Sequence, residues 1–336
     1  MINILTGDAL PVLCEMPDRS VHCCVTSPPY FGLRDYGVSK QIGLEKSPDE
    51  YIEKLVKVFQ EVRRVLKNDG TLWVNLGDSY AGSNGVGSKE EGCKQFSNVG
   101  SRRPKPSWKG IKISPKNLMG IPWRVAFALQ DDGWILRQDI IWHKPNPMPE
   151  SVRDRCTKAH EYIFMFSKKQ KYFYNQEAIK EPASRDPETS KTPDGWDTGL
   201  GSHGSIHKNG REKGRRSDKQ RGHSRRHAGF NERWDKMTLE KQCSGMRNKR
   251  SVWTVATRPF KEAHFATFPP NLIEPCILAG CPQDGVVLDP FSGSGTTGLV
   301  AVKFKRKAIL IELNPVYAMM SRERLGKLTP SLLSEK

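Results

Sequence analysis

The chain has 336 residues and a formal net charge of +17, with 36% hydrophobic and 27% charged residues. This length and composition indicate a globular protein with a substantial core and exclude a small disulfide scaffold. The sequence lacks an apolar run of membrane-spanning length, a secretory signal pattern and a CxxC cysteine pair. We therefore expect a cytoplasmic protein with no membrane segment and no metal, and the excess positive charge favours a polyanionic partner such as nucleic acid.

Strands and helices alternate in the first half of the chain. Apolar runs and helical spacing predict strands at 2–5 and 21–26, a helix at 48–67, a strand at 71–77, a helix at 117–130, and strands at 135–143 and 161–168. Residues 81–116 are rich in Gly, Ser and Lys and predict a long mobile loop. The pattern then stops until a strand at 251–255.

The C-terminal part alternates in the same way. The predicted elements are a helix at 269–279, a strand at 286–289, a helix at 296–304, a strand at 307–313 and a helix at 315–324. Alternation at both ends of the chain predicts an α/β fold with a doubly wound, mostly parallel sheet. The expected divisions are a catalytic half at 1–181, an inserted module at 182–250, a cofactor-binding half at 251–327 and a tail at 328–336.

The predicted insert is strongly basic. Residues 201–227 hold nine Lys and Arg against two acidic residues. Such a stretch is either a solvated low-complexity segment or an element that contacts phosphate groups, and both descriptions can hold at once. The candidate nucleic-acid-binding residues are Lys208, Arg211, Arg215, Arg216, Arg221, Arg225 and Arg226.

A glycine motif lies between a predicted strand and a predicted helix. Gly293, Gly295 and Gly298 fit the pattern GxGxxG, and Glu312 ends the next strand. In nucleotide-cofactor sites such glycines let the backbone approach the ligand, and such an acid accepts ribose hydroxyls. Dinucleotide oxidoreductases and S-adenosylmethionine enzymes both use this arrangement. Asp289, directly before the loop, favours the second class, because a carboxylate repels a pyrophosphate and attracts ammonium and sulfonium groups.

A second motif, Ser27-Pro28-Pro29-Tyr30, follows the predicted strand at 21–26 and so stands where ligands bind in open α/β sheets. The amine of cytosine or adenine is a weak nucleophile, and acceptors aimed at its N–H groups favour its attack. The Ser27 hydroxyl and the Pro28 carbonyl can be those acceptors. Tyr30 offers a flat face to a base extruded from the duplex. Alone, the motif is also compatible with an ordinary proline-rich loop.

Together the two motifs resemble those of the β-group amino-methyltransferases of DNA, in which the catalytic motif precedes the cofactor motif. The matching segments include DPFSGSGTTG (289–298), NLGDSY (75–80), IIWHKPN (140–146) and HFATFPPNLIEP (264–275). The resemblance covers 2–80, 117–180 and 251–325. It implies the Rossmann-like fold of S-adenosylmethionine-dependent methyltransferases, with permuted motif order.

The resemblance also implies roles for individual residues. The target base would be held by Ser27, Pro28, Pro29 and Tyr30. S-Adenosylmethionine would be bound by Asp8, Thr267, Pro269, Asp289, Phe291, Gly293, Gly295, Thr296 and Glu312. The basic insert, which matches nothing recognisable in the family, would contain the target-recognition region.

The resemblance thus predicts transfer of a methyl group to an amine of a base flipped out of double-stranded DNA. Ser27, together with ATFP at 266–269, favours cytosine N4 over adenine N6. We expect a protective role beside a cognate restriction endonuclease, and an orphan or phage-borne enzyme is equally compatible with the sequence. A non-catalytic nucleic-acid-binding protein and an RNA methyltransferase stay as alternatives. Cytosine carbon-5 methylation through Cys276 is disfavoured, because that cysteine lies in an apolar helical pattern.

Overall fold

The computed structural model describes residues 2–33, 35–82, 113–182, 246–257 and 268–327. By its internal contacts the chain divides into two compact units, one made of 1–179 and 250–336 and the other of 180–249. The second unit spans nearly the same residues as the predicted insert. Its described part is a small antiparallel pair of β6 (Glu181–Pro182) and β7 (Met246–Arg247). The seven candidate nucleic-acid-binding residues lie outside the described residues.

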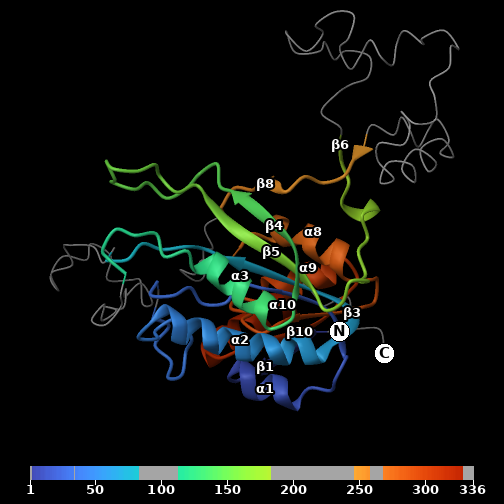
Figure 1. The fold of residues 1–336 in the computed structure, drawn as a ribbon. Coiled ribbons are helices and arrows are strands. Elements are labelled where there is room, and N and C mark those ends of the chain that lie inside the picture. The colour runs from blue at the N-terminus through green and yellow to red at the C-terminus, as the bar shows by residue number, and fades with distance from the viewer. Residues whose placement is uncertain (1, 34, 83–112, 183–245, 258–267, 328–336) are drawn as a thin grey trace, which may run out of the picture. The chain divides into compact units, whose positions relative to one another are not determined.

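The described strands of the first unit form one sheet (Figure 1). They are β1 (Ile2–Thr6), β2 (Val21–Thr26), β3 (Leu66–Leu76), β4 (Ile135–His143), β5 (His160–Ser167), β8 (Val252–Thr254), β9 (Val286–Asp289) and β10 (Lys307–Glu312). Their order across the sheet is β1-β10-β9-β2-β3-β5-β4-β8. Only β5 runs antiparallel to its neighbours, β3 and β4. The predicted mostly parallel sheet is confirmed.

Helices cover both faces of this sheet (Figure 1). One face carries α1 (Ala9–Glu15), α2 (Pro48–Val65) and α3 (Ile121–Asp131), and the other carries α8 (Pro270–Gly280), α9 (Thr296–Lys303) and α10 (Pro315–Gly326). Strand β2 shows why two cores form, because its successive side chains point to opposite faces. Cys24 belongs to the apolar cluster of the first face, and Cys23 and Val25 belong to that of the second.

Two local differences from the predicted elements have physical reasons. The helix α2 begins as expected, with Ser47 as its N-cap and Pro48 in the first turn, but it ends at Val65. Leu66 is fully buried and pairs with Val21, so β3 starts five residues before the predicted strand at 71–77. The helix α1 was not predicted, because its seven residues are too few to show a clear periodicity.

The sheet order brings the two sequence motifs to one place. β2 lies between β9 and β3, with Cys24 opposite Leu288 of β9. From β2 the chain proceeds to β3 on one side, and from β9 it proceeds to β10 on the other. The carboxyl ends of β2 and β9 therefore form a topological switch point, where open α/β sheets bind ligands.

In the described residues, no helix combines the length and the apolar character that crossing a membrane requires.

Candidate active site

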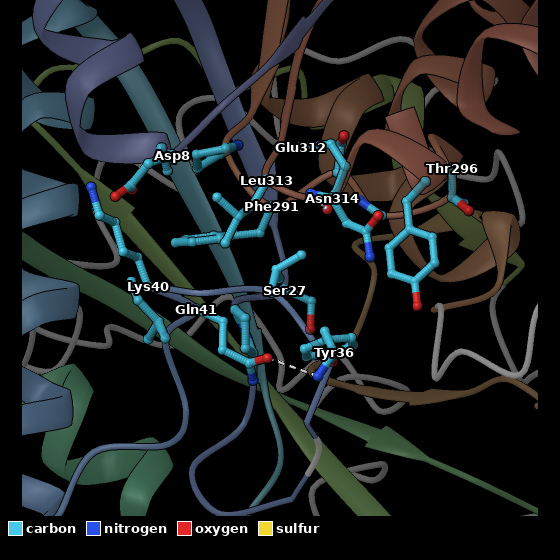
Figure 2. Close-up of a pocket in the computed structure, with 18 of the residues that line it drawn as sticks. Asp8, Ser27, Tyr36, Lys40, Gln41, Phe291, Thr296, Glu312, Leu313 and Asn314 are labelled. Carbon is cyan, nitrogen blue, oxygen red and sulfur yellow. Dashed lines mark hydrogen bonds between the residues drawn. The ribbon is translucent and has the colours of Figure 1, made fainter. Parts of the chain in front are cut away.

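A cavity opens at the carboxyl ends of β2 and β9, and residues of both motifs line it (Figure 2). The first motif contributes Ser27 and Pro29. The second contributes Pro290, Phe291, Ser292, Gly293 and Thr296. The remaining wall residues are Asp8, Ala9, Tyr36, Val38, Lys40, Gln41, Ile42, Phe268, Glu312, Leu313, Asn314 and Tyr317. The two motifs thus share one cavity, although 262 positions separate Ser27 from Asp289 in the sequence.

At two positions, the backbone of the glycine loop has a conformation that only glycine adopts without strain. Gly293 and Gly295 have φ values of 51° and 77°, in the left-handed region. No atom lies within 4 Å of the place where a Gly293 side chain would begin, so this part of the backbone is open to a ligand. A side chain at Gly295 would instead begin 3.1 Å from Ser321 Oγ of α10. Ser321 also donates a hydrogen bond of 2.7 Å to the Gly293 carbonyl, so α10 holds the loop in place.

Asp289 lies beneath the cavity and not on its wall. Its carboxylate is 1% exposed and accepts hydrogen bonds of 2.6 Å from both the Thr26 and the Thr297 hydroxyls. It also accepts one of 3.1 Å from the Phe291 backbone N–H. Burial raises the pKa of Asp289 to about 6, against the lowering effect of these hydrogen bonds. The carboxylate therefore joins the end of β2 to the glycine loop and to α9.

Of the two acids beside the glycine loop, Glu312 is the one that lines the cavity. One of its oxygens accepts from the Gly293 N–H and the other from the Asn314 N–H, each at 2.8 Å. Burial raises its pKa. Each carboxylate oxygen keeps a lone pair for a further donor, as the two hydroxyls of a ribose require. Glu312, the aromatic face of Phe291 and the carboxylate of Asp8 therefore fit a nucleoside.

The motif Ser27–Tyr30 is held by contacts on the side that faces away from the cavity. The Tyr51 hydroxyl donates to the Pro29 carbonyl at 2.8 Å, and Pro28 is buried. The Tyr30 hydroxyl donates to Glu161 at 2.7 Å, and its ring packs on Gly77, where a side chain would begin 2.6 Å from Tyr30 Cε2. Burial raises the pKa of Tyr30 well above its usual range, and the negative charge of Glu161 adds a smaller effect in the same direction.

The structure brings most of the predicted site residues to the cavity wall, but not all of them. The wall includes Asp8, Ser27, Pro29, Phe291, Gly293, Thr296 and Glu312. Pro28, Tyr30, Pro269, Asp289 and Gly295 lie next to or below it. Thr267 lies outside the described residues. The roles given to all of these residues stay predictions.

Sequence reasoning missed the segment 36–42, which forms one side of the cavity. The segment is closed at its base by a hydrogen bond of 2.8 Å from the Gly32 N–H to the Gly43 carbonyl. Within it, the Gln41 side chain accepts from the Tyr36 N–H at 2.8 Å. The available signal was the spacing of Gly32, Gly37 and Gly43, all of which adopt positive φ. Such glycines indicate turns, and the turns here fold the chain back over the motif Ser27–Tyr30.

In the described residues, no group of three or more His, Cys, Asp or Glu side chains that could hold a metal ion is found. Cys276, which cytosine carbon-5 methylation would need as a nucleophile, is fully buried in the core formed by α8 and does not line the cavity.

Comparison with known proteins identifies the family. The sequence profile of the N6/N4 methyltransferases, described as DNA methylases, matches residues 21–323. The chain belongs to this family of DNA methyltransferases. It is 44% identical to the type II methyltransferase M.XycI of Xanthomonas campestris pv. cyanopsidis, over 96% of this chain and 87% of that protein. The type II methyltransferase M.Cfr9I of Citrobacter freundii matches with the same identity and coverage.

Solved structures agree on the fold. The PvuII DNA methyltransferase, a cytosine-N4-specific enzyme, superposes with a TM-score of 0.59 at 18% identity, covering 100% of this chain and 93% of its own. TTHA0409 of Thermus thermophilus, solved with S-adenosylmethionine, superposes with a TM-score of 0.56 at 23% identity, covering 98% and 95%. The predicted methyltransferase fold is confirmed, and so is S-adenosylmethionine, the cofactor of this N6/N4 family.

Proposed function

We propose that this DNA methyltransferase transfers a methyl group to the exocyclic N4 amine of cytosine in double-stranded DNA, after the base has flipped out of the duplex. The observation that carries the proposal is the shared cavity, in which Ser27 and the glycine loop line the same space. Their strands, β2 and β9, are direct neighbours in the sheet. An amine held at Ser27 would therefore lie beside a methyl donor held at the loop.

The residues of the chain would act mainly by positioning. S-Adenosylmethionine supplies a methyl group on a positively charged sulfur. Glu312 would accept hydrogen bonds from its ribose hydroxyls, and Asp8 and Phe291 would hold its adenine end. Ser27 Oγ and the Pro28 carbonyl would accept hydrogen bonds from the two N–H groups of the target amine, which stabilises the positive charge that develops on nitrogen during attack. The amine nitrogen would bond to the methyl carbon as the sulfur–carbon bond breaks. The sulfur would keep that electron pair as a neutral thioether, and the amine would release one proton to water.

The choice of cytosine rests on the side chain at position 27. Serine is short and neutral, whereas the resemblance associates Asp or Asn at this position with adenine enzymes. The fold neighbour from PvuII is itself cytosine-N4-specific. Adenine N6 is the alternative, in an orphan or phage-borne enzyme, and a non-catalytic nucleic-acid-binding protein is a further one. The type II names of the relatives support a protective role beside a cognate restriction endonuclease.

The deciding experiment is incubation of the purified protein with plasmid DNA and a methyl-labelled cofactor, followed by digestion to nucleosides and mass spectrometry. Labelled N4-methylcytosine is expected. Labelled N6-methyladenine would establish the alternative base, and DNA binding without any label would establish a binding protein. A parallel reaction with RNA in place of DNA tests the alternative that the protein methylates RNA. Methylome sequencing of cells that express the protein then gives the DNA sequence that it recognises. A plasmid methylated at that sequence should resist the cognate endonuclease.

Ser27→Ala removes one of the two acceptors for the amine. By analogy with the loss of one oxyanion-hole hydrogen bond, turnover should fall by about 10²–10³-fold. Cofactor affinity, measured by calorimetry, should hardly change. Ser20→Ala is the matched control, because Ser20 stands just before β2 as Ser27 stands just after it, and its hydroxyl bonds only locally to the Pro17 carbonyl at 2.7 Å. Wild-type turnover in Ser27→Ala would contradict the assignment.

A further inference from the structure

A chain of polar side chains leads from Ser27 into the sheet. Ser27 Oγ lies 3.4 Å from Oδ1 of Asn75, a residue of β3 that is only 4% exposed. The amide nitrogen of Asn75 donates to the Tyr162 carbonyl at 3.0 Å and to Glu161 at 3.3 Å. Glu161 also pairs with Lys144 at the end of β4. Apart from Ser27, none of these residues lines the cavity.

The number of protons fixes the direction of each hydrogen bond. The Tyr30 hydroxyl lies 2.7 Å from the Glu161 carboxylate and 3.1 Å from Asn75 Oδ1, and it has a single proton. The closer and charged acceptor takes that proton. The Asn75 amide donates both of its protons to residues of β5, namely the Tyr162 carbonyl and the Glu161 carboxylate. Asn75 Oδ1 is thus fixed as an acceptor that faces Ser27.

The Ser27 proton consequently points into the protein. Its acceptor is Asn75 Oδ1, at 3.4 Å. The Ser27 lone pairs are then left for the cavity. A hydroxyl that turned its proton toward the cavity would instead donate to the amine nitrogen, and this would occupy the lone pair that must attack.

We infer that Asn75 is a positioning residue for the transfer reaction, and that it holds the Ser27 hydroxyl as a hydrogen-bond acceptor toward the target amine. Tyr30, Glu161 and Lys144 fix the orientation of the Asn75 amide. This inference rests on the proposed function, because it assigns Ser27 to the amine. It also gives Tyr30 the role of orienting the Asn75 amide, in addition to any contact with the base.

The test is a double-mutant cycle on single-turnover rates. Asn75→Leu keeps the size of the side chain and removes its acceptor, and it should lower the rate by about 10–10²-fold, a part of the loss expected for a missing acceptor. In a Ser27→Ala background the same change should cost less than about threefold, because no hydroxyl is left to orient. Cofactor affinity should be the same in all four proteins. Asn117→Leu, at an exposed asparagine bonded to the Ser114 carbonyl, is the control and should keep the wild-type rate.

A purely structural role for Asn75 predicts equal losses in both backgrounds, and this result would overturn the inference while leaving the proposed function intact. Glu161→Gln carries the same test if Asn75→Leu does not fold. The neutral amide of this variant is a weaker hydrogen-bond acceptor for Tyr30 and Asn75 than the carboxylate is. The single-turnover rate should therefore fall less than in Asn75→Leu, and again only when Ser27 is present. Failure of the wild-type protein to label any base amine of DNA would overturn both the function and the inference.

Discussion

At the residue scale, the two acids around the glycine loop have different surroundings. Asp289 is enclosed by the Thr26 and Thr297 hydroxyls, whereas Glu312 reaches the cavity wall. The motif predicted that acids stand at both positions, but not which of them is exposed to a ligand. That difference comes from the two hydroxyls that cover Asp289, because Thr26 ends the neighbouring strand β2 and Thr297 lies in the first turn of α9. Only the assembled sheet contains this information.

The burial of Asp289 predicts a pH dependence of stability. Its pKa in the folded protein is about 6, above the ordinary value near 3.8, so the folded state binds the proton more tightly than the unfolded state. In the absence of cofactor, the free energy of unfolding should therefore include a contribution from Asp289 that decreases as the pH rises from 3.8 to about 6. Above that pH the contribution should be constant. Asp289→Asn should remove that contribution. Urea unfolding at a series of pH values measures it.

The matched control for this measurement is Asp139→Asn, at an exposed position of β4. Its stability should follow that of the wild type across the same pH range. Parallel curves for the wild type and Asp289→Asn would show that the buried carboxylate does not titrate as stated.

At the element scale, the long apolar face of α2 was predicted well, whereas the short helix α1 was not predicted. The helix α2 buries Tyr51, Leu55, Val58, Phe59, Val62 and Val65 along one face, a pattern that repeats often enough to be recognised. The start of β3 was missed because Asn68-Asp69-Gly70 has the composition of a turn, although the pairing of Leu66 with Val21 keeps the chain extended. The antiparallel β5 was not foreseen, since an apolar run has no direction.

Two glycines at helix ends provide a test of how tightly the helices pack. Gly280 ends α8, and a side chain there would begin 2.5 Å from Thr71 Oγ1 and 2.6 Å from Trp73 Nε1 of β3. Gly280→Ala should therefore lower the free energy of unfolding by about 1–3 kcal/mol, the usual cost of overpacking. Gly326 ends α10 and has no atom within 4 Å of that place. Gly326→Ala should be neutral or stabilising by up to about 1 kcal/mol. Equal effects in urea unfolding would mean that α8 does not pack on β3 as described.

At the scale of the whole molecule, the order of the strands could not be derived from the order of the sequence. β1 pairs with β10, which follows it by some 300 residues, and β2 pairs with β9 across the whole insert. Local patterns predict elements, but pairing between distant strands depends on long-range packing. The resemblance predicted the fold that supplies this order, and the residues alone predicted only the doubly wound class.

The charge of the insert predicts a salt dependence for DNA binding. Each phosphate contact contributes about −0.9 to the slope of log affinity against log salt. Changing Lys208, Arg211, Arg215, Arg216, Arg221, Arg225 and Arg226 together to Gln should reduce that slope by several units and weaken binding. The control is Lys169→Gln with Lys171→Gln. These exposed lysines follow β5, which runs antiparallel to β3, so they lie at the opposite end of the strands from the cavity. An unchanged slope in the sevenfold variant would mean that the insert does not contact phosphates.

The pairing of β1 with β10 has a consequence for biosynthesis. Asp8 follows β1 and Glu312 ends β10, some 300 residues later in the chain, yet both line the same cavity. A nascent chain that already displays Ser27 has neither β9 nor β10 beside it, so its edge of the sheet stays incomplete. The cavity therefore cannot be complete before β10 has been synthesised, and a product that stops before β10 lacks Glu312.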